Sequence, residues 1–221
     1  MAPPPPTPSS SQRRASLLHT HVTAFLEALT PPDPSNSNPP PPPSPPSLID
    51  AYFTCSSASP PTIHEHGPPF TQKLLPFLGR PFIRKLQCVQ YFELMGGALE
   101  LAIKRGSVRV SVDADFPISD DKTGKYTSED IDADGNIWRQ LPGRVLATGQ
   151  CHCVSRKTGR GWDEEVVWVF GGFQESEDGS EARFQRWDIW ADAASAWVAE
   201  GGGDAGSVGW ESGQERDRMP W

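Results

Sequence analysis

The sequence predicts a single α+β domain in which helices pack against a mostly antiparallel β-sheet. Two apolar and aromatic runs near the C-terminus, GWDEEVVWVFGGF (161–173) and ARFQRWDIW (182–190), are separated by a polar turn at 175–180, which is typical of a β-hairpin. Near the N-terminus, apolar residues recur at helical spacing. Because strands and helices of this kind must bury their apolar side chains, we expect one core between the helices and the sheet.

Helices dominate the first half of the predicted domain. A first helix begins at Ser16 and ends at the next pair of prolines, and a short second helix covers 48–53. The apolar stripe of the first helix consists of Leu18, Val22, Phe25 and Leu29. A long helix is expected over 83–99, and its buried side is centred on Val89 and Phe92.

Strands make up most of the remainder. The segment TIHEHG contains a short strand at 62–66, and 107–116 alternates valine with polar residues, as a half-buried strand does. A further strand is expected over 145–155, and the segment ADAASAWVAE after the hairpin predicts a closing helix. The GGF run at 171–173 indicates a bulge or a close approach of two backbones.

The first strand of the hairpin is apolar on both faces. One face carries Val166, Trp168 and Phe170. The other face carries Val167, Val169 and Phe173. Since neither face is left for water, we expect helices on one side and a pocket or a partner chain on the other. The sequence therefore predicts a homodimer that forms through the outer face of the sheet.

Composition sets the boundaries of the domain. The 221 residues include 24 Pro and 20 Gly, concentrated in segments that are poor in apolar residues. We predict a disordered Pro-rich tail at 1–15, one domain at 16–200 with a Pro-rich insertion at 31–47, and a disordered Gly-rich tail at 201–221. The insertion is expected to be a polyproline II spacer on the surface or, alternatively, a ligand for an SH3 or WW module.

Charge and hydropathy disfavour several classes of partner. The net charge of -8 opposes binding to nucleic acid or anionic lipid, because both depend on clustered Lys and Arg. No apolar run approaches the ~20 residues of a membrane span. The four cysteines, Cys55, Cys88, Cys151 and Cys153, show no disulfide-framework spacing. We expect a cytoplasmic protein with no nucleic-acid or membrane partner; the alternative is a mitochondrial presequence around Arg13 and Arg14.

Five segments resemble a known superfamily. They are TIHEHG, LPFLGRPF, YFELMGGALE, VVWVFGGF and RWDIWADAASAW. Together with the order of elements, they resemble the NTF2-like superfamily and, within it, the SnoaL-like domain proteins of fungal and bacterial type, over roughly 16–200. The resemblance implies a cone in which a curved antiparallel sheet is wrapped around a long helix and encloses an apolar pocket. It also implies dimerisation through the outer face of the sheet.

The resemblance implies a pocket for a small apolar or aromatic molecule. The residues that we expect to line it are Tyr91, Phe92, Trp138, Trp168, Trp187 and His152. The alternative is that these aromatic side chains form ordinary core. The chain would then be a dimeric interaction scaffold whose Pro-rich segments or outer sheet face bind the partner.

Catalysis in such a pocket would need an acid–base pair. His64 and His66 share one face of the predicted strand, with Glu65 on the other, and Asp188 or Asp113 is available as the carboxylate partner. These four residues are the catalytic candidates for a cofactor-free isomerase, cyclase or dehydratase of a polyketide-like or terpenoid substrate. The acid–base sets of ketosteroid isomerases and scytalone dehydratases, which share the fold, do not map onto this chain. Alternatively, the histidines bond to backbone carbonyls at the pocket rim.

No cofactor or metal is expected from the motifs. The sequence has no phosphate-binding Gly loop and no G-x-S-x-G elbow. DIDADGN (130–136) begins like a calcium loop, but the twelfth position is Leu141 instead of Glu. His64 and His66 are half of a zinc ligand set, and His152 is a conceivable third ligand, but the usual H-E-x-x-H and C-x-x-C spacings are missing.

Overall fold

The computed structural model describes residues 8–30, 41–54, 56, 59–117, 129–131 and 137–203. The helices are α1 (Ser10–Leu29), α2 (Pro45–Tyr52), α3 (Lys85–Ala98) and α4 (Ala193–Ala199), with a 3₁₀ helix, η1 (Pro69–Lys73). The strands are β1 (Thr62–His66), β2 (Pro81–Ile83), β3 (Leu99–Ile103), β4 (Arg109–Asp113), β5 (Glu129–Ile131), β6 (Ile137–Ser155), β7 (Gly161–Ser176) and β8 (Ala182–Trp190).

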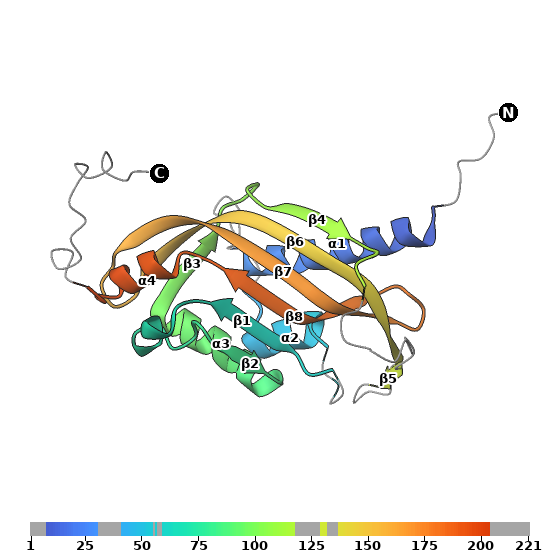
Figure 1. Ribbon diagram of the computed structural model, residues 1–221, viewed down its shortest axis with the longest axis horizontal. Coiled ribbons are helices and arrows are strands. Elements are labelled where there is room, and N and C mark those ends of the chain that lie inside the picture. Colours follow the sequence, from blue (N-terminus) through green and yellow to red (C-terminus); the bar gives the residue numbers. More distant parts are fainter. Residues whose placement is uncertain are drawn as a thin grey trace, which may run out of the picture.

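All of these strands belong to one sheet. The strand order is β2-β1-β8-β7-β6-β3, and β4 and β5 also pair with β6. Every pairing is antiparallel except that between β1 and β8, which is parallel. The two longest strands, β6 and β7, arch across the molecule, and α1, α2 and α3 lie on the concave side (Figure 1). The expected α+β fold with a curved, mostly antiparallel sheet is confirmed.

Helix α1 starts earlier than its apolar stripe. It begins at Ser10 because Ser9 and Gln12 form a capping box, in which the Ser9 side chain accepts from the Gln12 N–H and the Gln12 side chain accepts from the Ser9 N–H. The buried residues of the helix are Leu18, Val22, Phe25 and Leu26. The stripe predicted from the sequence is therefore the face that packs on the sheet, although Leu29 is only half-buried.

Helix α3 is shorter than predicted, and its buried side is shifted. Cys88, Tyr91 and Phe92 are buried, whereas Val89 is only half-buried. The helix ends at Ala98, just after two glycines, which destabilise helix interiors. The chain then continues directly into β3. Strand β3 pairs with β6, a long-range partner that the local helical pattern of 83–99 conceals.

Strand β7 changes side at Gly172. This glycine has a φ of 66°, and a Cβ atom built there would lie 2.8 Å from the Cβ of Gln185, so only glycine fits. Before this point Val166, Trp168 and Phe170 face the core, as expected. Beyond it Phe173 also faces the core and meets Phe184 of β8 edge-on, with ring centroids 6.4 Å apart. The prediction that Phe173 shares a face with Val167 and Val169 was wrong for this reason.

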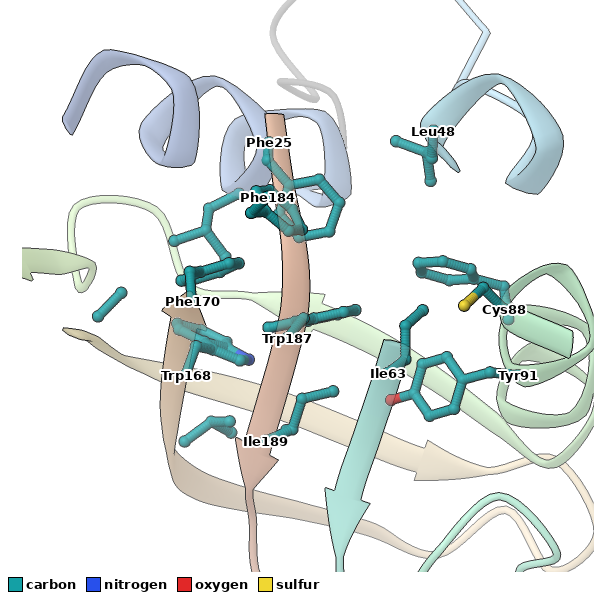
Figure 2. Close-up of a cluster of buried hydrophobic side chains, with 14 of the residues drawn as sticks. Phe25, Leu48, Ile63, Cys88, Tyr91, Trp168, Phe170, Phe184, Trp187 and Ile189 are labelled. Carbon is teal, nitrogen blue, oxygen red and sulfur yellow. The ribbon is translucent and has the colours of Figure 1, made fainter. Parts of the chain in front are cut away.

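The core is an aromatic cluster between α1 and the sheet. The Phe25 ring of α1 lies over β8, with centroids 5.2 Å from Phe184 and 5.0 Å from Trp187 (Figure 2). Phe170 of β7 packs 5.0 Å from Phe184 in the same layer. Edge-on contacts of this kind add to the energy of burial. Helix α1 therefore covers one half of the concave face, and the other half is left for α3 and for a cavity.

Several predictions fall outside the described residues. They concern 1–7 of the tail predicted at 1–15, 31–40 of the insertion predicted at 31–47, 204–221 of the tail predicted at 201–221, and 132–136 of the calcium-like loop. The rest of the first tail and of the insertion overlaps α1 and α2, which begin at Ser10 and Pro45, so disorder up to residue 15 was wrong. Within the described ranges, the structure contains no helix that is long and apolar enough to cross a membrane.

Candidate functional site

A cavity of about 310 Å³ lies on the concave side of the sheet. It is bounded by α3, by the inward faces of β3, β6, β7 and β8, and by the start of α4. Its apolar lining includes Met95, Leu99, Ile103, Val166, Trp168, Trp187, Ile189 and Ala196. Most of the wall is therefore hydrophobic, and the few polar groups that reach it determine what the cavity can bind.

A buried carboxyl and a buried phenol form one polar part of this wall. Glu65 lies in β1 beside Ile63, and the alternation that buries Ile63 also turns Glu65 inward. The Tyr91 hydroxyl donates a hydrogen bond to Glu65 Oε2 at 2.5 Å. Figure 2 shows the Tyr91 ring on α3 with its hydroxyl directed toward β1. Both residues line the cavity, and both are almost fully buried.

The environment of Glu65 favours its neutral form. Burial raises the pKa of Glu65 from its ordinary 4.5 to about 7; the Tyr91 hydrogen bond lowers it in part, and the charge of Glu164 raises it. Burial and the neighbouring Glu65 also raise the pKa of Tyr91. Both groups are therefore buried and have raised pKa values. Proton transfer between this pair and a bound molecule is chemically feasible.

Two indole N–H groups of residues at the cavity have no acceptor in the part of the chain that the structure describes. The Nε1 atoms of Trp162 and Trp187 are buried, and neither has a hydrogen-bond partner among the described residues. Both residues line the cavity. A buried donor without an acceptor costs about 1–3 kcal/mol, so an acceptor atom on a bound molecule would recover part of that cost.

A second carboxyl, Glu164 of β7, is held by its neighbours. It accepts from Cys153 Sγ at 3.3 Å and from the backbone N–H of Asp192 at 2.9 Å. Burial, Glu164 and Glu65 together raise the pKa of Cys151 to about 12, so this thiol stays protonated. Glu164 therefore fixes the start of α4 at the rim of the cavity, while Glu65 is held by one side chain only.

The predicted aromatic lining is partly at this cavity. Tyr91, Trp168 and Trp187 line it. Phe92 instead packs on Trp187, with ring centroids 6.0 Å apart. Trp138 lies beyond the bulge in β6, under the Arg183 guanidinium at 4.2 Å.

His152 does not line the cavity either. It is an outward residue of β6, where the inward positions are Cys151 and Cys153. Its Nδ1 lies 2.8 Å from Asp163 Oδ1, and 56% of its side chain is exposed. The alternation of β6 therefore places His152 on the opposite side of the sheet from the cavity.

The predicted histidine–aspartate group forms, but on the outer face of the sheet. His66 Nε2 lies 3.2 Å from Asp188 Oδ1, and His64 Nδ1 lies 3.9 Å from the same atom. The two histidines share a face, as predicted, and Glu65 occupies the face that points to the cavity. Asp113 is exposed on β4, a strand that pairs with β6 and not with β1. Asp188 is therefore the carboxylate partner of these histidines in the structure.

Sequence reasoning placed Glu65 on the far side from the histidines but gave it no role. The available signal was its position two residues after Ile63, the one apolar residue of TIHEH. Because the apolar residue of a short strand faces the core, its i+2 neighbour faces the core as well. The partner, Tyr91, lies 26 residues away, and no local pattern connects the two.

No protein-family model matches the chain, and no curated protein matches it. Its structure is similar to a ketosteroid isomerase-like protein from Erwinia carotovora atroseptica, with 11% identity and a TM-score of 0.47, over 81% of this chain and 96% of that one. It is also similar to an NTF2-like protein from Burkholderia xenovorans, with 9% identity and a TM-score of 0.44, over 86% of this chain and 98% of that one. At these values the likeness carries nothing about activity.

Proposed function

We propose that the chain binds a small, mainly apolar or aromatic molecule in the cavity of the concave face. The observation that carries the proposal is a mostly apolar cavity whose lining includes the buried Glu65 carboxyl and two tryptophans, Trp162 and Trp187, whose indole N–H groups have no partner among the described residues. The volume of about 310 Å³ is at the lower end of the usual range for small-molecule sites. A ligand of one or two rings with a single polar group fits these limits.

The polar groups specify the kind of ligand. Two indole donors favour an acceptor such as a carbonyl oxygen. The Glu65 carboxyl, held by Tyr91, lies in the same wall and can bond a second polar atom. An anionic ligand is disfavoured, because Glu65 and Glu164 both line the cavity. Arg156 is the cationic side chain among the described lining residues, and it is already paired with Glu100, with Nη1 3.0 Å from Oε1. A neutral aromatic or alicyclic ketone has the required chemistry.

Filling the cavity tests this proposal. Ala196→Phe introduces a ring at the wall, and we expect it to weaken binding of 1-acetonaphthone, a neutral aromatic ketone, by about tenfold or more, because the ring takes the volume of the ligand. Quenching of tryptophan fluorescence during a titration measures the affinity. Ala194→Phe, on the exposed side of the same helix, is the matched control and should bind as wild type does. Equal affinity in wild type and Ala196→Phe would exclude the cavity as the site.

A second candidate function is cofactor-free catalysis, and the Glu65–Tyr91 pair is the observation that favours it. Glu65 as carboxylate would take a proton from the carbon beside a ketone; the C–H electron pair moves toward the carbonyl oxygen, where the indole N–H groups stabilise the negative charge. Returning the proton to a different carbon completes an isomerisation. This pair replaces the histidine–aspartate pair as the acid–base candidate, since His64, His66 and Asp188 lie across the sheet from the cavity.

Hydrogen exchange separates the catalyst from a simple binder. In D₂O, wild type is expected to exchange the α-hydrogens of bound 1-acetonaphthone faster than buffer does, as followed by proton NMR. Glu65→Gln removes the base and keeps the shape, so exchange should fall by about 10²-fold or more, while the ketone still binds. Exchange at the buffer rate with wild type that binds the ketone would leave binding as the function.

Assembly and location are the remaining parts of the proposal. Dimerisation through the outer sheet face is supported by Leu146 and Trp190, which are 43% and 42% exposed there. Light scattering at tens of micromolar measures it, and a monomer would count against it. Location in the cytoplasm rests on the charge and on the buried free thiols of Cys151 and Cys153; fractionation of cells that express the chain tests it.

A further inference from the structure

The outer face of the sheet carries two histidines and an aspartate that the proposed function does not use. The pairing of β6, β7, β8 and β1 aligns Leu146, Val169, Asp188 and His64 in one row across the four strands. The next row contains Trp190 and His66. Because β1 and β8 run parallel, the two histidines of β1 stand beside Asp188 and Trp190 of β8 along the same edge of this face.

Three of these residues have their donor atoms close together. One ligand atom each from His64, His66 and Asp188 can be chosen so that all three lie within 4.8 Å of one another. We propose that these residues bind a divalent transition-metal ion, with Zn²⁺ as the best fit. Two imidazole nitrogens and one carboxylate oxygen are a common three-residue set for zinc, and a solvent molecule completes the tetrahedron.

The spacing of the donor atoms suits this ion. Bonds of ~2.0–2.1 Å place the ligand atoms of tetrahedral zinc about 3.3 Å apart. His66 Nε2 and Asp188 Oδ1 are 3.2 Å apart. His64 Nδ1 is 3.9 Å from the same oxygen, so a small rotation of one ring closes the set.

The site is accessible from solvent but supported from within the sheet. The His64 and His66 side chains are 24% and 31% exposed, whereas Asp188 is 6% exposed. The His66 ring is stacked on Trp190, with centroids 4.2 Å apart and an interplanar angle of 5°. These contacts hold the rings near their positions before an ion arrives, which lowers the cost of assembling the site.

Arg186 opposes the ion. Its guanidinium binds both carboxylate oxygens of Asp188, with Nε to Oδ2 at 2.5 Å and Nη2 to Oδ1 at 3.0 Å. This bond orients the carboxylate, as groups around metal ligands commonly do. The guanidinium also places a positive charge beside the site, and its hydrogen bond to Oδ1 makes this oxygen a weaker ligand. Removing the guanidinium should therefore strengthen metal binding.

Calorimetric titration of the full chain with Zn²⁺, after treatment with chelator, tests the site. We expect one ion per chain, and about tenfold weaker binding or more in His66→Gln and in His64→Gln. His152→Gln is the matched control, because it removes the other histidine–carboxylate pair of the same face, that with Asp163. It should bind zinc as wild type does. Visible absorption of Co²⁺ in the same variants reports whether the ion is tetrahedral.

Arg186→Gln gives a result that a fortuitous surface site would not. It should bind Zn²⁺ several-fold more tightly than wild type, since it relieves the charge beside Asp188 and keeps the exposed surface otherwise unchanged. Circular dichroism of each variant shows that it is folded. No uptake of zinc by wild type in molar excess, or zinc binding that is lost in His152→Gln and kept in His64→Gln and His66→Gln, would overturn the proposal.

Discussion

Phe25→Ala is expected to lower the free energy of unfolding by about 3–5 kcal/mol, the cost of deleting a fully buried phenylalanine. The Phe25 side chain is 0% exposed, and its ring contacts aromatic rings from α2, β7 and β8 as well as the loop residue after α2. The cavity left behind is lined by aromatic rings on α2, β7 and β8. Because these rings are held by helices and strands, they can move only a little to fill it. Denaturant melts of wild type and variant measure the change.

The control for this prediction is a large apolar residue that is not buried. Leu86 on α3 is 81% exposed, so Leu86→Ala should change the free energy of unfolding by less than about 0.5 kcal/mol. Losses of similar size in both variants would mean that the aromatic cluster contributes no more than the surface does, and that α1 is only loosely attached to the sheet.

The second large effect concerns pH. The folded pKa of Glu65 is about 7, and its ordinary value is 4.5. Below pH 4.5 the carboxyl is protonated in both states. Between pH 4.5 and 7 the folded protein keeps the proton and the unfolded chain has lost it, so stability falls as the pH rises. The contribution of Glu65 should decline by up to roughly 3 kcal/mol over this window and then stay constant.

Glu65→Gln isolates this contribution. Glutamine keeps an acceptor for the Tyr91 hydroxyl and has no titrating proton. Other groups contribute with the opposite sign, since burial lowers the pKa of His21 and of His64 and their neutral forms gain stability as the pH rises. The difference in unfolding free energy between variant and wild type cancels them, because Tyr91 and Glu164 face position 65 in both proteins. Between pH 4.5 and 7 this difference should change in favour of glutamine. A constant difference would show that folding does not raise the pKa of Glu65.

Much of the fold was visible in local patterns. The alternation of Val166, Trp168 and Phe170 is local, and so is the helical stripe that buries Phe25. Both were assigned correctly because the spacing of apolar residues within a strand or helix indicates which of its faces is buried. Strand β3 was missed, since its partner β6 lies about 50 residues further on and the preceding helical pattern extends into it.

The candidate site was less accessible to such patterns. The shared face of His64 and His66 followed from period-2 alternation, but that rule does not say which face is inside. Only Ile63 indicates which face of β1 points inward. Tyr91 was expected to line the pocket with its ring, not to donate a hydrogen bond. The Glu65–Tyr91 pair joins a strand to a helix, so its geometry is set by tertiary packing, which period-2 and period-3.6 counting do not contain.

Strand β1 contributes residues to two separate sites, one on each face of the sheet. Its five residues place Glu65 in the cavity and His64 and His66 on the outer face, all on one stretch of backbone. Substitutions within this strand are therefore not independent, because a shift that suits an ion on one side displaces the carboxyl on the other. Ala196 and Arg186, which belong to other elements, are the positions from which each side can be altered alone.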